Sequence, residues 1–288
     1  MAQQKQHIRD RTLFDGVFTK YLLKFCFKVL FKLTGWRTCN AIKQGAGITI
    51  AAPHTSNWDF LYALGAAILL DKKIYFSIKD SWCKLPIIGH FMMWCGAIPI
   101  DRSNSSGGQV AQINTFIQRH RDSDIFFLFT PEGTRSNTKK WRSGFYHVAE
   151  GTRLPIFLAK IDYRLKEVGV FHSYQLTGHK TLDMQALQAP YNHIQGKYPQ
   201  YQYPPYTGPM PTISDAEAAI MQAIYTLQST ANQSNIAAHL SHQHTIASTL
   251  NVLLEKGIVS TVDSSDEPYY QLTLTGRGYL CHLIPILR

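Results

Sequence analysis

Cysteine is scarce in this chain of 288 residues: there are five, and no two of them have the C-x-x-C spacing of a zinc or redox site. Thiols scattered in this way also exclude the dense disulfide framework of small secreted proteins. We therefore expect a reducing compartment, no metal site and no resident cofactor. The first eleven residues are polar and charged, so we expect no secretory signal.

Acidic side chains are also few, with 19 Asp and Glu against 29 Lys and Arg, a formal net charge of +10. The excess lies in residues 1–190, which hold 25 basic and 13 acidic side chains, whereas residues 191–288 hold four and six. Basic surfaces attract anionic membranes and phosphate-bearing molecules. We expect such partners for the first part of the chain and not for the second.

A long apolar run free of charge is missing from the most apolar N-terminal stretch, residues 14–33, because lysines stand at 20, 24, 28 and 32. Their spacing of one helical turn predicts an amphipathic helix with a basic face. Four lysines favour a helix that lies in the membrane surface over one that spans the bilayer. We therefore expect region 1–40 to attach the protein peripherally, on the cytoplasmic side. The alternative is an ordinary packed helix with solvated lysines.

Apolar residues are abundant, at 45% of the chain, which is enough to fill the core of one large domain and a small one. Short apolar runs predict strands at 48–52, 74–78, 97–100, 125–129, 154–161 and 168–174. Helical patterns lie between them at 56–70, 85–94 and 109–120. The alternation predicts an α/β sandwich over a mainly parallel or mixed sheet.

His54 follows the first of these strands, after Pro53, in the turn before the first helix. We expect Ser56 to cap that helix and Asp59 to lie in its first turn, close enough to contact His54. The carboxyl edge of the strands is where α/β folds place their chemistry. A histidine oriented by a carboxylate acts as a general base. The spacing alone is not diagnostic, because a turn histidine near a capping aspartate gives the same pattern.

Four blocks of sequence, in the same order, resemble the glycerolipid (lysophospholipid) acyltransferase family over roughly residues 45–165. They read HTSNWD at 54–59, GAIPIDR at 96–102, FTPEGTRS at 129–136 and LPIF at 154–157. The resemblance implies the fold of that family, with an acyltransferase domain over 41–197. Thr130 and Ala159 depart from the usual family pattern. Both departures leave the His54 and Asp59 pair unchanged and bear only on acyl-chain preference.

The resemblance also implies roles for individual residues. His54 would be the general base and Asp59 its orienting acid. Arg102 and Arg135 would hold the acceptor's glycerol phosphate, in a substrate pocket that Glu132, Gly133 and Thr134 shape. The implied reaction moves a fatty acyl group from acyl-CoA or acyl carrier protein, as co-substrate, to the hydroxyl of a lysophospholipid such as 1-acylglycerol 3-phosphate. An acyl-accepting aminolipid remains open as the acceptor. The basic run 139–142 around Trp141 is either a solvated loop or a lip that meets lipid headgroups.

Proline and tyrosine dominate residues 198–211, which predicts an extended linker. The region 212–288 then shows helical patterns at 216–227, 235–240 and 245–256, and a β-hairpin pattern at 258–275. Residues 253–259 and 274–278 resemble winged-helix domains of the multidrug-resistance regulator type, which implies a small α+β domain.

The charge of this second domain decides which partner we expect. The helix that would read DNA, residues 242–256, carries one cation, Lys256, at its far end. We therefore expect a protein partner or a homodimer contact through 212–288, and no nucleic-acid binding. The competing interpretation is a membrane-associated, lipid-sensing regulator whose winged helix binds nucleic acid or protein. Salt-dependent DNA binding would favour that interpretation.

Overall fold

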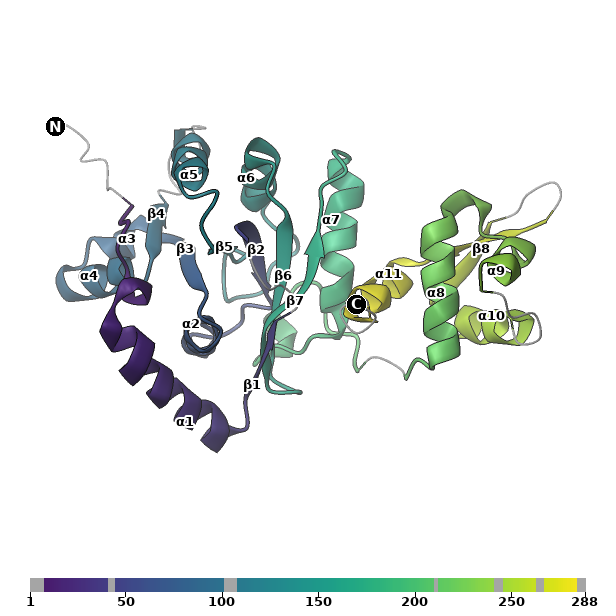
Figure 1. Cartoon of the computed structure of the whole chain (residues 1–288), viewed down its shortest axis with the longest axis horizontal. Helices are drawn as coiled ribbons and strands as arrows, with labels where there is room; N and C mark the ends of the chain where they lie inside the picture. Colours follow the sequence, from purple (N-terminus) through teal and green to yellow (C-terminus); the bar gives the residue numbers. More distant parts are fainter. Residues whose placement is uncertain are drawn as a thin grey trace. The chain divides into compact units, whose positions relative to one another are not determined.

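The computed structural model describes residues 8–40, 45–100, 108–209, 212–240, 246–262 and 267–283. The chain divides into two compact units (Figure 1). Unit 1 comprises Met1–Gly178 and Ile194–Pro205, and unit 2 comprises His179–His193 and Tyr206–Arg288. The expected domain bounds at 197 and 212 do not coincide with these units. Residues 179–193 group with unit 2, and residues 198–205 of the expected linker group with unit 1.

Unit 1 is built on a seven-stranded sheet with the strand order β1-β7-β6-β2-β5-β3-β4. β6 and β7 pair antiparallel, and the other five neighbouring pairs are parallel, which confirms the expected mainly parallel or mixed sheet. The strands are β1 (Arg37–Asn40), β2 (Gly47–Ala52), β3 (Lys73–Lys79), β4 (Ala97–Ile100), β5 (Ile125–Phe129), β6 (Ile156–Asp162) and β7 (Glu167–Tyr174).

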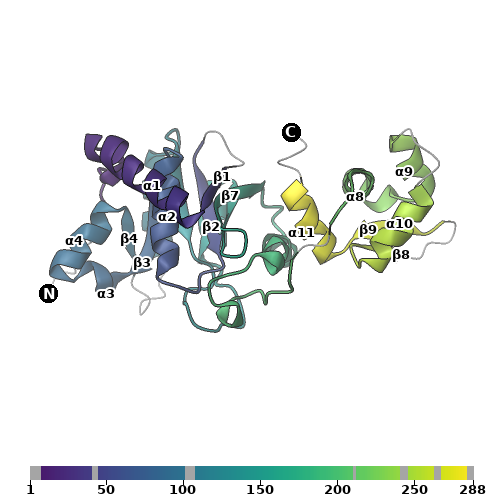
Figure 2. The same cartoon turned by 90° about the horizontal axis from the view of Figure 1, so that it is seen from below.

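Helices cover both faces of this sheet (Figures 1 and 2), as parallel strands buried on two sides require. Successive side chains of a strand point to opposite faces, so Ala51 faces α2 while its neighbour Ile50 faces away from it. The helices of unit 1 are α1 (Lys24–Thr34), α2 (Trp58–Leu69), α3 (Asp80–Cys83), α4 (Pro86–Trp94), α5 (Gly108–Arg119) and α6 (Gly144–Thr152), with short turns η1 (Leu13–Asp15), η2 (Thr19–Leu23) and η4 (Pro199–Tyr201).

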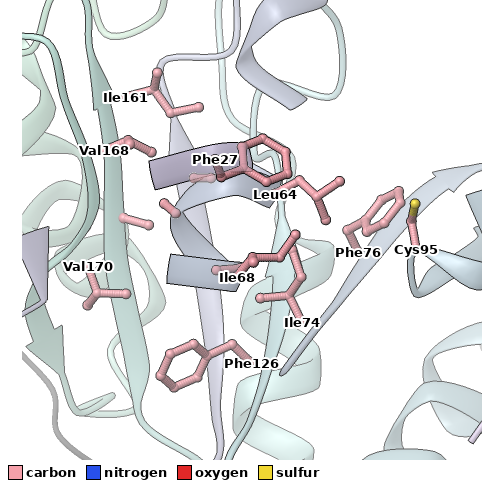
Figure 3. Packing of buried hydrophobic residues seen from close by; sticks show 14 of the residues in the cluster. Phe27, Leu64, Ile68, Ile74, Phe76, Cys95, Phe126, Ile161, Val168 and Val170 are labelled. Carbon is pink, nitrogen blue, oxygen red and sulfur yellow. The ribbon is translucent and has the colours of Figure 1, made fainter. Parts of the chain in front are cut away.

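The core beneath α2 joins α1, α2 and the strands (Figure 3). Phe27 of α1 packs with Leu64 of α2 and with Phe76 of β3 in one buried cluster. Gly65 allows α1 to approach α2 closely, because a Cβ atom there would lie 2.5 Å from Cδ1 of Phe27. This contact fixes the position of α2, the helix that follows the His54 turn.

The N-terminal helix is amphipathic, but its apolar side chains are divided between a buried group and an exposed group. It begins with the π-helical turn η2 and continues as α1, which ends at Gly35 with a left-handed backbone (φ 75°). Phe27 and Phe31 are buried against the protein, while other apolar side chains of the same helix are exposed beside Lys28 and Lys32. Within the part of the chain that the structure describes, no helix is long and apolar enough to cross a bilayer.

Unit 2 contains a helical core and a two-stranded hairpin, in agreement with the expected winged-helix-like α+β domain. Its elements are α7 (Lys180–Gln188), η3 (Ala189–His193), α8 (Asp215–Leu227), η5 (Gln228–Thr230), α9 (Gln233–Leu240), α10 (Ile246–Glu255), β8 (Val259–Val262), β9 (Tyr269–Leu272) and α11 (Leu274–Leu283). Met221 and Leu250 are buried together in its core. Gly257 follows α10 with a positive φ of 64°, as expected of the residue that stops this helix.

Candidate active site

The turn between β2 and α2 carries His54, as the sequence predicts. β2 ends at Ala52, a cis peptide bond precedes Pro53, and α2 begins at Trp58. Asn57 occupies the N-cap position rather than Ser56, whose Oγ accepts the backbone N–H of Trp58 at 3.2 Å. The helix therefore starts one residue later than expected, and Asp59 still lies in its first turn.

His54 and Asp59 contact each other directly, with Nδ1 of the imidazole 3.0 Å from Oδ2 of the carboxylate. The Asp59 side chain is 2% exposed, whereas that of His54 is 21% exposed. A carboxylate accepts hydrogen bonds, so Nδ1 carries the proton and Nε2 keeps its lone pair. The buried acid thus holds the imidazole in the tautomer that a general base needs, with part of the ring open to solvent.

Asp59 is itself held by three further donors. The backbone N–H groups of Thr55 and Ser56 each donate to Oδ2 at 2.9 Å, and the Tyr163 hydroxyl donates to Oδ1 at 2.7 Å. Burial raises the pKa of Tyr163 above its ordinary value, and the negative charge of Asp59 raises it further. The phenol therefore stays protonated and remains a donor. Both oxygens of the carboxylate are fixed before any substrate binds.

Glu132 follows β5, the strand next to β2, and both of its carboxylate oxygens accept hydrogen bonds from the protein's own backbone. Its Oε2 accepts the backbone N–H of His54 at 2.5 Å, and its Oε1 accepts that of Tyr203 at 3.1 Å. The residue is 2% exposed. Burial raises the pKa of Glu132 to about 7; the two N–H groups oppose this shift and the nearby charge of Asp59 adds to it. Glu132 positions the His54 turn, a role that the sequence pattern did not reveal.

The turn after Glu132 brings Gly133, Thr134 and Arg135 to the same edge. Gly133 has a positive φ of 66°, and a Cβ atom there would lie 2.5 Å from Nε of Arg142, so glycine suits this position on two grounds. Thr134 Oγ1 accepts the backbone N–H of Ser136 at 3.2 Å. Arg135 is exposed, and its Nη1 donates to Oδ1 of Asn57 at the start of α2. Arg102, the other expected phosphate ligand, lies outside the described residues.

Sequence reasoning missed the segment 194–205 as part of this site. The Tyr198 N–H donates to Oγ1 of Thr55 at 3.2 Å, which ties the segment to the His54 turn. Lys197 lies with its Nζ 5.2 Å from the centroid of the Trp58 ring. Lys197 and Arg135 therefore flank Trp58 and Asn57, two neighbouring residues at the N-terminus of α2. A proline- and tyrosine-rich composition gave no signal for this cation.

Trp141 is buried rather than placed at a lipid-facing lip. The side chain is 5% exposed, and its Nε1–H donates to the carbonyl oxygen of Tyr203 at 2.9 Å. This hydrogen bond is partly buried, and the indole N–H satisfies the carbonyl. Trp141 and Glu132 together anchor Tyr203, so this tryptophan supports the site from behind.

An apolar pocket lies under α2, on the sheet face that α2 covers. Small side chains leave the space: Ala63, Ala66 and Ala67 on α2 face Ala51 and Ala159 on the strands. Ala63 is one turn along α2 from Asp59. The pocket wall is almost wholly apolar, which suits a hydrocarbon chain.

Two families match the chain. Residues 37–159 match the Acyltransferase family, within unit 1, and residues 213–282 match the Penicillinase repressor family. Unit 1 contains an acyltransferase domain. Unit 2 contains a winged-helix domain of the penicillinase repressor type, which refines the resemblance to multidrug-resistance regulators.

One curated relative of the acyltransferase domain is a 1-acyl-sn-glycerol-3-phosphate acyltransferase from Streptococcus pneumoniae. It is 27% identical over 125 residues, which are 42% of this chain and 46% of that protein. The chain therefore spans about half the length of the relative that it matches. Among the residues that the structure describes, no group of three or more His, Cys, Asp or Glu side chains could hold a metal ion.

Proposed function

We propose that the acyltransferase domain moves a fatty acyl group from acyl-CoA or acyl carrier protein to the hydroxyl of a lysophospholipid such as 1-acylglycerol 3-phosphate. The observation that carries the proposal is the His54 and Asp59 pair, with the acid buried under three further donors and the imidazole partly open. The family match and the S. pneumoniae relative support the choice of reaction.

In the proposed mechanism, Nε2 of His54 takes the proton of the acceptor hydroxyl as its oxygen attacks the thioester carbonyl. Asp59 stabilises the imidazolium that forms. The tetrahedral intermediate then loses the thiolate as the carbon–sulfur bond breaks, and the imidazolium returns its proton to the sulfur. The products are the ester and the free thiol. No nucleophile from the protein is needed.

Two cations are proposed to bind the acceptor's phosphate. Arg135 is oriented by Asn57, and Lys197 lies over the ring of Trp58 at the same helix start, where the N-terminal end of α2 also favours an anion. Arg102 keeps its proposed place in this set on the strength of the resemblance. Glu132, Gly133 and Thr134 are proposed to shape the turn that presents Arg135.

The acyl chain is proposed to enter the apolar pocket under α2, which begins one turn beyond Asp59. A carbonyl placed at His54 would leave the hydrocarbon chain to run along the helix and away from water. The reactive end of the donor would then stay at the exposed side of the imidazole. This arrangement assigns headgroup and chain to opposite sides of the catalytic pair.

A purified chain supplied with acyl-CoA and 1-acylglycerol 3-phosphate tests the proposal. Release of free thiol should depend on the acceptor, and mass spectrometry should find the diacylated product. An acceptor-independent release, or none with any lysophospholipid and either donor, would refute it.

We also propose that unit 2 serves protein contacts or dimerisation rather than DNA reading. α10 carries no Lys or Arg, and the Nζ of Lys256 is bound by Glu217 and by the carbonyl oxygen of Thr212. DNA binding requires several cations that can reach phosphates. Light scattering of the full chain should show a dimer, or a complex once a protein partner is added. A DNA mobility shift that weakens with salt would favour the regulator instead.

A further inference from the structure

Large apolar side chains are exposed mainly on two segments of unit 1. Of twenty such side chains among the described residues, thirteen lie on these segments. The N-terminal segment exposes Val17, Phe18, Tyr21, Leu22, Phe25, Val29 and Leu33, and the α3–α4 hairpin exposes Trp82, Leu85, Ile87, Ile88, Phe91 and Trp94. Apolar surface concentrated in this way marks an interaction site.

The α3–α4 hairpin is itself two-sided. Cys83, Met92 and Met93 pack against the core of unit 1, whereas Ile87 is 85% exposed on the other side. Gly89 locks the hairpin together, because a Cβ atom there would lie 2.2 Å from the carbonyl oxygen of Cys83. The exposed side chains are thus held on a firmly packed element and not on a loose loop.

The hairpin lies at the same edge of the sheet as the catalytic turn. β2, β5 and β3 are adjacent and parallel, and their ends lead to His54, Glu132 and α3 respectively. Strands are about 4.8 Å apart, so the hairpin starts roughly 10 Å across the sheet from the His54 turn. β4 begins opposite Phe76, the fourth residue of β3. The chain therefore runs back along only about half the length of β3 before β4 starts.

The N-terminal segment starts at the opposite edge of the sheet, because Lys24 pairs with Asp71 and Asp15 pairs with Lys73, the first residue of β3. Figure 1 shows the start of the N-terminal helix near α3 and α4, and Figure 2 shows that α4 lies between it and α3. Lys28 and Lys32 are exposed on α1, and Lys79 is exposed where β3 meets α3. The acid of α3, Asp80, is paired with Lys84. Apolar side chains surrounded by cations complement an anionic bilayer, whose negative surface attracts lysines.

We propose that the α3–α4 hairpin inserts into the interface of an anionic membrane next to the N-terminal helix and places the catalytic turn at the lipid surface. This inference rests on the proposed function for its purpose, because a lysophospholipid could then reach His54 without leaving the bilayer. Trp82 and Trp94 lie at the depth of the lipid headgroups in this arrangement, where tryptophan is favoured. A second copy of the chain on the same surface is the rival occupant.

Vesicle binding of the full chain tests the proposal. The test variant is Ile87→Ser/Phe91→Ser, and the matched control is Leu182→Ser/Tyr225→Ser, which removes two exposed apolar side chains from unit 2. With vesicles of phosphatidylglycerol and phosphatidylcholine, the test variant should bind at least tenfold more weakly than wild type, and the control should bind as wild type does. Equal binding by the test variant and wild type would overturn the proposal.

Two further measurements separate the alternatives. Brominated lipid should quench the tryptophan fluorescence of the wild type, and the quenching should fall in Trp82→Phe/Trp94→Phe; unchanged quenching would contradict insertion. Light scattering without lipid should give the same mass for wild type and the Ile87→Ser/Phe91→Ser variant. A dimer that this variant dissociates would assign the surface to a second copy.

The acyl-transfer assay keeps this inference distinct from the proposed function. With a short-chain, water-soluble lysolipid the Ile87→Ser/Phe91→Ser variant should match wild type, and with vesicle-borne lysolipid it should be at least tenfold slower. If the wild type transfers no acyl group at all, the proposed function fails, while vesicle binding and quenching still decide the docking surface. Equal rates on vesicles would count against docking near the site.

Discussion

The Tyr163 hydroxyl donates a 2.7 Å hydrogen bond to Oδ1 of Asp59, the carboxylate oxygen that does not face His54. Tyr163 lies just after β6, about a hundred positions beyond the acid that it holds, and its ring packs edge-on against Trp36 at 5.0 Å between centroids. The proposed orienting acid is therefore held in turn by a tyrosine that packs in an aromatic cluster. Catalysis should depend on this second layer.

Replacing Tyr163 with phenylalanine keeps the ring packing and removes the donor. Asp59 is 1% exposed, so water cannot readily replace the lost bond, and a hydrogen bond to a charged group contributes about 1.5 to 3 kcal/mol. We expect kcat to fall about tenfold or more while KM changes little, because Tyr163 is proposed to act through Asp59 and not on the substrate. Steady-state kinetics at constant pH measures both. A rise in KM with an unchanged kcat would assign Tyr163 to substrate binding instead.

Replacing Arg135 should weaken binding of the phosphate-bearing acceptor. Arg135→Ala removes a guanidinium that Asn57 orients, and we expect KM for 1-acylglycerol 3-phosphate to rise about tenfold. Arg135→Lys should recover only part of this loss, because an ammonium lacks the planar fork. Monoacylglycerol, which has no phosphate, is the control acceptor. If its KM rises equally, Arg135 does not act on the phosphate.

The pH dependence of stability should report on Glu132. The folded protein keeps a proton on Glu132 up to about pH 7, whereas the unfolded chain releases it near the ordinary pKa of 4.5. Between these values the folded state binds more protons, so the free energy of unfolding falls as pH rises, by about 3 kcal/mol over the whole range. Glu132→Gln abolishes this dependence.

Thermal unfolding of wild type and Glu132→Gln from about pH 5 to about pH 8 tests this sign. The variant loses one acceptor for a backbone N–H, so it should be less stable than wild type at the acid end. Its deficit should shrink as pH rises. A deficit that grows with pH would mean that burial does not dominate at Glu132.

The width of the pocket under α2 should set the acyl-chain preference. Ala66 is 3% exposed and lines the pocket, so Ala66→Phe fills the space that the chain is proposed to occupy. We expect the rate with a long-chain acyl-CoA to fall at least tenfold relative to a short-chain one. The ratio within one enzyme preparation corrects for any loss of folded protein, since overpacking itself costs about 1 to 3 kcal/mol. An unchanged ratio would place the chain elsewhere.

Periodicity predicted most strands of the sheet and the order of strands and helices along the chain. Strands such as β5 (Ile125–Phe129) are short apolar runs with clear ends, and the structure places them as expected. β1 (Arg37–Asn40) was missed, because a four-residue polar edge strand has no apolar run to announce it. α6 (Gly144–Thr152) was also missed, since two glycines weaken its helical pattern although its buried face includes Phe145 and Val148.

The contact between His54 and Asp59 was predicted because the two residues are neighbours in sequence, so local geometry settles it. The partners that hold the pair come from distant positions: Tyr163, Lys197 and Tyr203 lie on segments with no pattern that links them to His54. By resemblance Glu132 was assigned to the substrate pocket, whereas in the structure each of its carboxylate oxygens accepts a backbone N–H. Such contacts depend on the tertiary fold, which single-sequence patterns do not encode.

The rate of acceptor-dependent thiol release by His54→Ala tests the central claim most directly. A general base contributes about a hundredfold to ten-thousandfold, and Asp59→Asn, which favours the wrong tautomer, should fall in the same range. Both variants should keep the wild-type unfolding temperature within a few degrees and should still bind vesicles. We predict that His54→Ala retains at most about one per cent of the wild-type kcat; a kcat within threefold of wild type would contradict the account.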